Sequence, residues 1–198
     1  MAGDQAPRRF AAVEVPGEVR AAVDGALAPL RRRCPGLRWS DPAGWHLTVA
    51  FLGALPAVRV DAARVALAGA AGACPPFTTR LDGRLGSFAG VLWAGVVPDA
   101  GLEALAAEVR ARLEDAGLPS GQRPFRGHLT LARARGRGRV PRAATARRVV
   151  PELEVPVDRL TLMCARPAPD GAPYTVEDAW ALGVGVPGHG RVDEGPGS

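Results

Sequence analysis

The sequence predicts one domain in which strands and helices are combined in two similar lobes that face a single cleft. Three observations lead to this prediction. The chain has 198 residues, 47% hydrophobic and 23% charged, which is typical of a folded chain with one sizeable core. Apolar patterns with strand and helix periods alternate along it. A five-residue motif occurs twice, 82 residues apart, which indicates an internal repeat.

The first half of the chain predicts two strands and two helices. In order, they are a strand at 10–15, a helix at 18–33, a strand at 46–52 and an alanine-rich helix at 58–71. Pro16-Gly17 ends the first strand and Gly53 ends the second. Pro29 should disturb the last turn of the first helix, because proline lacks the backbone N–H that the helix needs.

The second half predicts a strand pair, a helix and further strands. In order, they are strands at about 77–86 and 91–97, a helix from the N-cap Asp99 to Leu113, a strand at 128–133, an Arg-Gly loop at 134–139, a short helix near 141–148 and strands near 153–164 and 174–182. We expect one bilobal domain over residues 1–185. Residues 186–198 are rich in glycine and proline and should form a loose tail.

The repeated motif carries a histidine and a threonine on the same strand face. Residues 46–50 read His-Leu-Thr-Val-Ala and residues 128–132 read His-Leu-Thr-Leu-Ala. Side chains alternate between the two faces of a strand, so His46 and Thr48 should share a face with Ala50. His128 and Thr130 should share a face with Ala132 in the same way. Facing each other, the two strands would place two imidazoles and two hydroxyls around a pocket, with the alanines leaving room for a ligand.

Two imidazoles at one pocket are typical of phosphodiester hydrolysis by proton transfer. A neutral histidine removes a proton from the attacking water while a protonated one delivers a proton to the leaving oxygen. Histidine suits both roles, since its ordinary pKa of about 6.5 allows either form near neutral pH. Threonine hydroxyls can donate to the non-bridging oxygens of the phosphate. A single His-x-Thr is more often structural, but two copies in a chain with three histidines favour catalysis. The third, His189, lies in the tail and is incidental.

Other kinds of site have little support in the sequence. There is no HExxH motif, no paired cysteine and no G-x-S-x-G elbow, so we expect neither a metal ion nor another cofactor, and no serine nucleophile. Cys34, Cys74 and Cys164 are widely spaced and should be buried or inert thiols. No apolar run reaches the length of about 18 residues that spans a bilayer, and the N-terminus does not resemble a secretory signal. We therefore expect a cytoplasmic protein without a membrane partner.

Basic residues are concentrated in one part of the chain. All 25 are arginines, and nine of them lie within residues 116–151, which contain no aspartate or glutamate. The rest of the chain has 16 arginines against 20 acidic residues, so the positive net charge is local. Clustered guanidinium groups attract phosphate oxygens and can bind them in pairs, which indicates a phosphate-rich partner; a solvated Arg-Gly loop remains the alternative.

Four segments resemble one known family, the two-histidine phosphoesterases, and specifically the bacterial and archaeal RNA 2',3'-cyclic phosphodiesterases, also called 2'-5' RNA ligases. They read Arg-Phe-Ala-Ala-Val-Glu-Val-Pro at 9–16, Trp-His-Leu-Thr-Val-Ala-Phe-Leu-Gly at 45–53, Phe-Arg-Gly-His-Leu-Thr-Leu-Ala-Arg at 125–133 and Gly-Ala-Pro-Tyr-Thr at 171–175. The resemblance covers nearly the whole chain. It implies an α+β fold with two pseudo-symmetric antiparallel sheets, backed by helices, around a central cleft.

The resemblance also implies roles for individual residues. His46 would be the proton donor and His128 the proton acceptor, with Thr48, Thr130 and Arg133 as substrate-binding residues. The substrate would be an RNA with a 2',3'-cyclic phosphate end, such as a tRNA fragment, and the product a 2'-phosphomonoester formed by a monomer without metal.

Two positions limit this transfer of roles. Gly127 stands where family members often have proline. Strand alternation places Arg133 on the face opposite His128 unless the strand bends, so its contact with phosphate stays open. Phe10, Trp93 and Tyr174 could stack a base, although core positions are more frequent for such side chains.

The motifs leave three alternatives open. The same acid and base pair could join RNA ends through a 2'-5' bond, or hydrolyse a small cyclic nucleotide. A protein that binds RNA ends without turnover is the third alternative.

Overall fold

The computed structural model describes residues 6–121, 124–136, 138–145, 148–165 and 173–183. In chain order its strands and α-helices are β1 (Arg8–Glu14), α1 (Gly17–Arg33), β2 (Leu37–Trp39), β3 (His46–Ala54), α2 (Val60–Ala73), β4 (Phe77–Phe88), β5 (Val91–Val96), α3 (Ala100–Asp115), β6 (His128–Ala134), β7 (Leu153–Val157), β8 (Arg159–Cys164) and β9 (Thr175–Ala181). Most of the elements that the sequence predicts are present within a few residues of their expected bounds.

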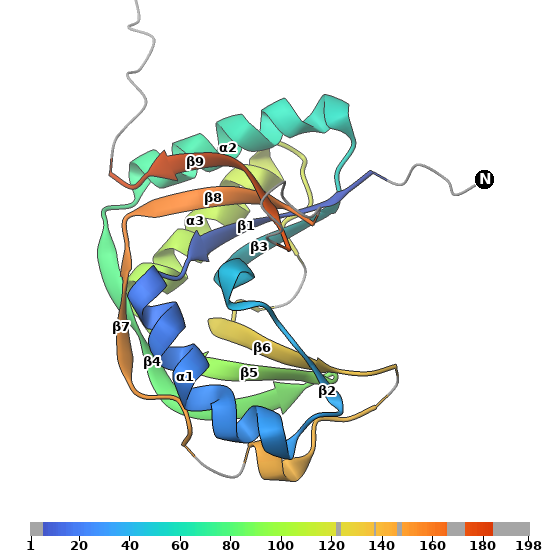
Figure 1. The fold of residues 1–198 in the computed structure, drawn as a ribbon. Coiled ribbons are helices and arrows are strands. Elements are labelled where there is room, and N and C mark those ends of the chain that lie inside the picture. Colours follow the sequence, from blue (N-terminus) through green and yellow to red (C-terminus); the bar gives the residue numbers. More distant parts are fainter. Residues whose placement is uncertain (1–5, 122–123, 137, 146–147, 166–172, 184–198) are drawn as a thin grey trace, which may run out of the picture.

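All pairs of neighbouring strands are antiparallel, and the strands form one ladder in the order β7-β4-β5-β6-β3-β1-β8-β9, with β2 paired to β6. Figure 1 shows two groups of strands, β3, β1, β8 and β9 in one and β4, β5, β6 and β2 in the other. The groups meet where β3 pairs with β6 at Leu47 and Leu129. The predicted α+β class is therefore confirmed, and the two groups of strands join edge to edge beside the two motif histidines.

The helices bury their apolar faces against this ladder in one continuous core. Helices α2 and α3 pack on each other; α2 also contacts β8 and β9, and α3 contacts β3 and β4. Helix α1 lies on the other side of the molecule, beside the group that contains β4 and β5 (Figure 1). Leu27, Leu67 and Leu105, one from each helix, are fully buried in the same cluster as Leu47 and Leu129. Among the described residues, no helix is long and apolar enough to cross a membrane.

Several elements differ from the sequence prediction. Helix α1 continues through Pro29 to Arg33, so the predicted disturbance of its last turn is wrong as far as the helix length is concerned. Strand β2 was not predicted, because its three residues are too few to show the alternation of apolar and polar side chains that marks a strand. The segment 153–164 contains two strands, one on each side of Asp158. Of the helix expected at 141–148, the structure describes residues 141–145 and 148, and these contain a 3-10 turn at Arg142–Ala144. The expected tail at 186–198 is outside the described residues, and the domain bounds stay a prediction.

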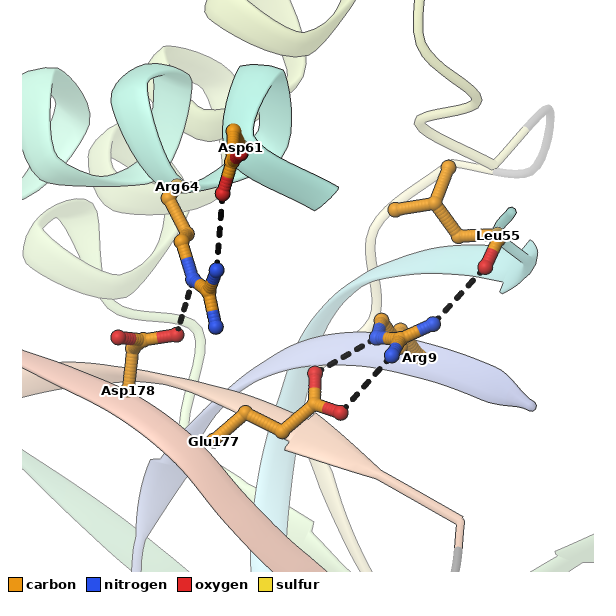
Figure 2. A network of polar contacts seen from close by, with 6 residues as sticks. All are labelled: Arg9, Leu55, Asp61, Arg64, Glu177 and Asp178. Carbon is orange, nitrogen blue, oxygen red and sulfur yellow. Dashed lines mark hydrogen bonds and ion pairs between the residues drawn. The ribbon is translucent and has the colours of Figure 1, made fainter. Parts of the chain in front are cut away.

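Strand β9 is the last strand of the ladder, and two arginines attach it to its surroundings (Figure 2). Arg9 of β1 donates from Nε and Nη2 to the carboxylate of Glu177, at 2.6 and 2.9 Å, and from Nη1 to the Leu55 carbonyl at 2.8 Å. Arg64 of α2 donates to Asp178 at 2.7 Å. Glu177 and Asp178, which are neighbours in β9, thus bind one arginine of β1 and one arginine of α2. This attachment fixes the start of β9, which follows directly after Tyr174.

Candidate active site

The two repeated motifs line a common pocket of about 540 Å³ between the two groups of strands. His46 and Thr48 reach it from β3, and His128, Thr130 and Arg133 reach it from β6. We call it the histidine pocket. The five residues expected at a site from the sequence therefore come together in space, although the two motifs lie in different halves of the chain.

Each motif strand contains a β-bulge directly after its threonine. In β3, Thr48 pairs with Ala12 and Ala50 with Ala11, so Val49 has no partner in the ladder. In β6, Trp93 pairs with Thr130 and Leu92 with Ala132, so Leu131 has no partner in β5. A bulge adds one residue to a strand and therefore reverses the alternation of all that follows. The two copies of the motif share this irregularity as well as their sequence.

Because of the bulges, the residues that follow Val49 and Leu131 lie on the strand face opposite to the one predicted. Ala50 and Ala132 are buried at 4% and 0% exposure and do not line the histidine pocket, so the expectation that they leave room for a ligand is wrong. The next residue in each strand turns to the pocket instead. It is Arg133 in β6, against the prediction from simple alternation, and Phe51 in β3. Phe51 is 60% exposed although it is a large apolar side chain.

A carbonyl two residues upstream holds each imidazole in the same way. His46 Nδ1 lies 2.8 Å from the Gly44 carbonyl oxygen, and His128 Nδ1 lies 2.7 Å from the Arg126 carbonyl oxygen. A carbonyl can only accept, so Nδ1 must donate its hydrogen in both rings. The neutral tautomer is therefore fixed, and Nε2 is left to accept or release a proton. A Cβ at Gly44 would overlap Pro173, so this turn requires glycine.

Aromatic rings restrict the orientation of the first imidazole. The Phe10 ring stacks on His46 at 4.7 Å between centroids, and Tyr174 meets His46 edge-on at 5.1 Å. Phe10 is 5% exposed, as expected for a core residue. Tyr174 lines the histidine pocket, which the sequence did not favour.

The second imidazole has aromatic neighbours from the β4–β5 hairpin. Phe88 meets His128 edge-on at 5.1 Å, and Trp93 lies 6.4 Å from it between centroids. A Cβ at Gly86 would overlap the Trp93 ring, so a glycine is needed beneath the indole. Rigid rings on two sides keep each histidine in one rotamer, which pre-organises the pair.

Burial and positive charge act together on both histidines. Burial lowers the pKa of His46, and the charges of His128 and Arg133 lower that pKa further, against the opposing effect of the Gly44 carbonyl. The pKa of His128 is also lowered, first by burial and then by Arg133 and Arg126, and the Arg126 carbonyl opposes this shift. The free protein therefore favours neutral imidazoles. An anion bound between them would favour the protonated form again.

The remaining polar groups of the pocket are open to a ligand. Within the described part of the chain, the hydroxyls of Thr48 and Thr130 and the guanidinium of Arg133 form no hydrogen bond or ion pair with another side chain. Asp41 also lines the pocket, and its carboxylate accepts the Ala43 N–H at 2.9 Å. The pocket thus offers several unoccupied donors to a small oxyanion.

Cysteines and metal ligands are not gathered at this pocket. Cys34, Cys74 and Cys164 are buried and form no disulfide, which confirms the predicted burial of the thiols. Over the residues that the structure describes, no group of three or more His, Cys, Asp and Glu side chains is arranged to hold a metal ion.

An antiparallel α+β fold that brings two His-x-Thr strands to one pocket defines a two-histidine phosphoesterase. Comparison with known proteins agrees with this class. The family model of the 2'-5' RNA ligase superfamily matches residues 19–166, which is most of the chain. The chain belongs to the 2'-5' RNA ligase superfamily.

Three similar proteins illustrate how far the likeness extends. A protein of Thermus thermophilus named RNA 2',3'-cyclic phosphodiesterase is 33% identical over 96% of this chain and 96% of its own length. One of the same name from Geobacillus stearothermophilus is 29% identical over 95% of this chain, but the chain spans only 60% of that relative. The crystal structure of E. coli LigT in complex with 3'-AMP superposes with a TM-score of 0.69 at 29% identity, covering 89% of this chain and 98% of LigT.

Proposed function

We propose that this protein hydrolyses 2',3'-cyclic phosphate ends of RNA to 2'-phosphomonoesters, with His46 as general acid and His128 as general base and without a metal ion. The observation that carries the proposal is the pair of imidazoles in the histidine pocket, each with its Nδ1 hydrogen bonded to a carbonyl. Both rings are left with Nε2 for proton transfer. The names of the two curated relatives support the same activity.

The proposed step moves two protons and exchanges one bond at phosphorus. A water oxygen attacks the phosphorus and gives its proton to Nε2 of neutral His128. The bond between phosphorus and the ribose 3' oxygen breaks, and that oxygen takes the proton from Nε2 of protonated His46. The product has a free 3' hydroxyl and a phosphate on the 2' oxygen. Exchange with solvent then returns both imidazoles to their starting forms.

Thr48, Thr130 and Arg133 hold the phosphate in this proposal. The two hydroxyls donate to the non-bridging oxygens, whose charge must be stabilised when phosphorus has five oxygen neighbours. The guanidinium of Arg133 supplies positive charge near both imidazoles, as its effect on their pKa values indicates. The negative cyclic phosphate raises the pKa of His46 on binding, which supplies the protonated acid.

The terminal base stacks on aromatic rings at the rim of the pocket. Phe51 presents an exposed phenyl ring there, and Tyr174 lines the same pocket. Stacking tolerates any base, because every base has a π face. The 3'-AMP in the LigT crystal structure supports a place for one nucleotide in folds of this kind.

Product analysis with a defined RNA tests the proposal. The substrate is an oligonucleotide with a 2',3'-cyclic phosphate end, incubated in excess chelator, with RNA carrying a 2'-phosphate and RNA carrying a 3'-phosphate as chromatographic standards. We expect turnover that yields the 2'-phosphate and that falls at least about 100-fold in His46→Gln and in His128→Gln separately. A 3'-phosphate product, or turnover that the chelator abolishes, contradicts the proposal. A 5'-hydroxyl RNA added to the same mixture reveals ligation as a longer product.

A further inference from the structure

A second and larger cavity lies directly beside the histidine pocket. It has a volume of about 980 Å³, and its lining includes Arg133, Arg139 and Arg142 together with the tip of the β4–β5 hairpin. We call it the arginine pocket. Phe88, Ala89, Val91 and Arg133 line both cavities, so the two share one wall. Arg133 therefore faces the phosphate site on one side and the arginine pocket on the other.

The lining of the arginine pocket is strongly basic. Arg133, Arg139 and Arg142 are exposed, and in the described ranges no carboxylate pairs with them. Other arginines do have such partners: Arg64 binds Asp178, and Arg148 binds Glu152. Among the residues with a described position, those that line the pocket include no aspartate or glutamate. Three guanidinium groups with free donors around one concavity form a site for phosphate oxygens.

The backbone near this pocket gives the ligand room. Ala89 and Gly90 form the hairpin tip, with φ angles of 46° and 76°, and the Gly90 carbonyl accepts the Ala134 N–H at 2.8 Å. Gly136 and Gly138 line the pocket without side chains. The hairpin tip and the end of β6 are thus held together, with small residues between the arginines. Cavities that bind small ligands usually have volumes of about 300–1,000 Å³, so this one can hold a nucleotide unit.

An RNA whose cyclic phosphate end lies in the histidine pocket can extend into the arginine pocket. An RNA with a cyclic phosphate end has no residue beyond that phosphate, and the chain continues only from the 5' oxygen of its last nucleotide. With the cyclic phosphate between His46 and His128, the preceding phosphodiester must leave the histidine pocket. Phe88 and Arg133 line both cavities, so a backbone that leaves the histidine pocket across these two side chains enters the basic lining of the arginine pocket. Basic grooves of this kind follow the backbone of single strands.

We infer that the arginine pocket binds the phosphodiesters upstream of the terminal nucleotide, through Arg139 and Arg142 with Arg133 at the boundary. This inference rests on the proposed function and extends it. The site selects polynucleotide ends over cyclic mononucleotides, because a mononucleotide has no upstream phosphate to place there. Recognition is independent of base sequence, since phosphates carry no sequence information.

The experiment compares two substrates and three proteins. The substrates are adenosine 2',3'-cyclic phosphate and a four-nucleotide RNA that ends in a 2',3'-cyclic phosphate. The proteins are the unaltered chain, the double variant Arg139→Gln/Arg142→Gln and the control Arg135→Gln. Arg135 lies in the same loop and carries the same charge, but it lines neither pocket. All exchanged side chains are exposed, and thermal melting verifies that each variant is folded.

For the double variant, we expect kcat/KM to fall about 10- to 30-fold on the four-nucleotide RNA and less than about threefold on the mononucleotide. The control should change either value less than about threefold. The slope of log kcat/KM against log salt concentration for the RNA should become shallower by about 0.7 for each lost phosphate contact. Equal losses on both substrates, or no loss on the RNA, overturn the inference.

A binding measurement separates this inference from the proposed function. Fluorescence anisotropy with a labelled four-nucleotide RNA ending in a 3'-phosphate reports affinity without turnover. Should the unaltered chain hydrolyse neither substrate, weaker binding by the double variant but not by Arg135→Gln still supports the arginine pocket while the proposed function fails. Equal binding by all three proteins refutes the pocket. A double variant that is slow only in joining a 5'-hydroxyl RNA shows that the pocket holds the incoming strand, which also refutes the upstream assignment.

Discussion

Replacing Arg9 with methionine should destabilise the fold by about 2–4 kcal/mol, because it leaves a carboxylate and a carbonyl without their donor. Arg9 makes two hydrogen bonds to Glu177 and one to Leu55, with lengths between 2.6 and 2.9 Å, and its side chain is 10% exposed (Figure 2). Methionine keeps most of the apolar stem, so the change removes the charge rather than the packing.

The expected magnitude depends on how far water can compensate. Breaking one side of a fully buried ion pair costs about 3–5 kcal/mol. The Glu177 side chain is 20% exposed, so water partly solvates it after the change and the value should be lower. Removing both charges, with Arg9→Met and Glu177→Met together, leaves no unpaired ion and should recover about 1 kcal/mol or more relative to Arg9→Met.

Urea denaturation measures these free energies of unfolding, with Arg8→Met as the control because Arg8 is an exposed neighbour on the same strand. We also expect kcat/KM to fall, since the Arg9–Glu177 pair fixes the start of β9 and with it Tyr174, which contacts His46. A loss of less than about 1 kcal/mol in Arg9→Met, or a loss just as large in Arg8→Met, would show that the pair does not hold β9 in place.

Four further substitutions, at Thr48, Thr130, Phe51 and Arg133, test the histidine pocket itself. Thr48→Val and Thr130→Val should each lower kcat about 100-fold with little effect on KM, because the hydroxyls act mainly on the charge of the transition state; unaltered steady-state rates would refute this role. Phe51→Leu should raise KM about 5- to 10-fold at unchanged kcat through lost stacking, whereas Val65→Ala on the exposed face of α2 should change neither. Arg133→Gln removes a positive charge that lowers the pKa of both histidines, so protonation becomes easier and the pH profile of kcat/KM should move to higher pH; a profile that stays in place contradicts this electrostatic role.

The sequence predicted those parts of the site that depend on local pattern. Strand periodicity and the repeated His-x-Thr motif placed His46, Thr48, His128 and Thr130 at one pocket, and the structure brings them together. This succeeded because both bulges lie after the threonine, so the histidine and the threonine of each motif, two positions apart, still share a strand face.

The parts that were wrong or missed depend on partners distant in the chain. Val49 and Leu131 form bulges only because of the strands that pair with β3 and β6, so simple alternation placed Arg133 on the wrong face and gave no sign of Phe51. Arg9 and Glu177 are separated by 168 positions, and no local period connects them. Phe51 and Arg133 occupy equivalent positions, because each directly follows one copy of the five-residue motif. A side chain that points into the pocket from one copy therefore indicates the equivalent side chain in the other copy.

The central claim is that two imidazoles act as acid and base on the same phosphorus, and a leaving-group substitution tests it most directly. The measurement is kcat/KM for the unaltered chain, His46→Gln and His128→Gln, on a 2',3'-cyclic phosphate and on its analogue with sulfur in place of the 3' oxygen. A thiolate leaves without a proton, so the analogue does not need an acid.

On the oxygen substrate, both variants should lose about 100-fold or more. On the sulfur analogue, His46→Gln should regain most of the lost rate while His128→Gln stays slow. Equal recovery of both variants, or of neither, would contradict the assignment of His46 as acid and His128 as base.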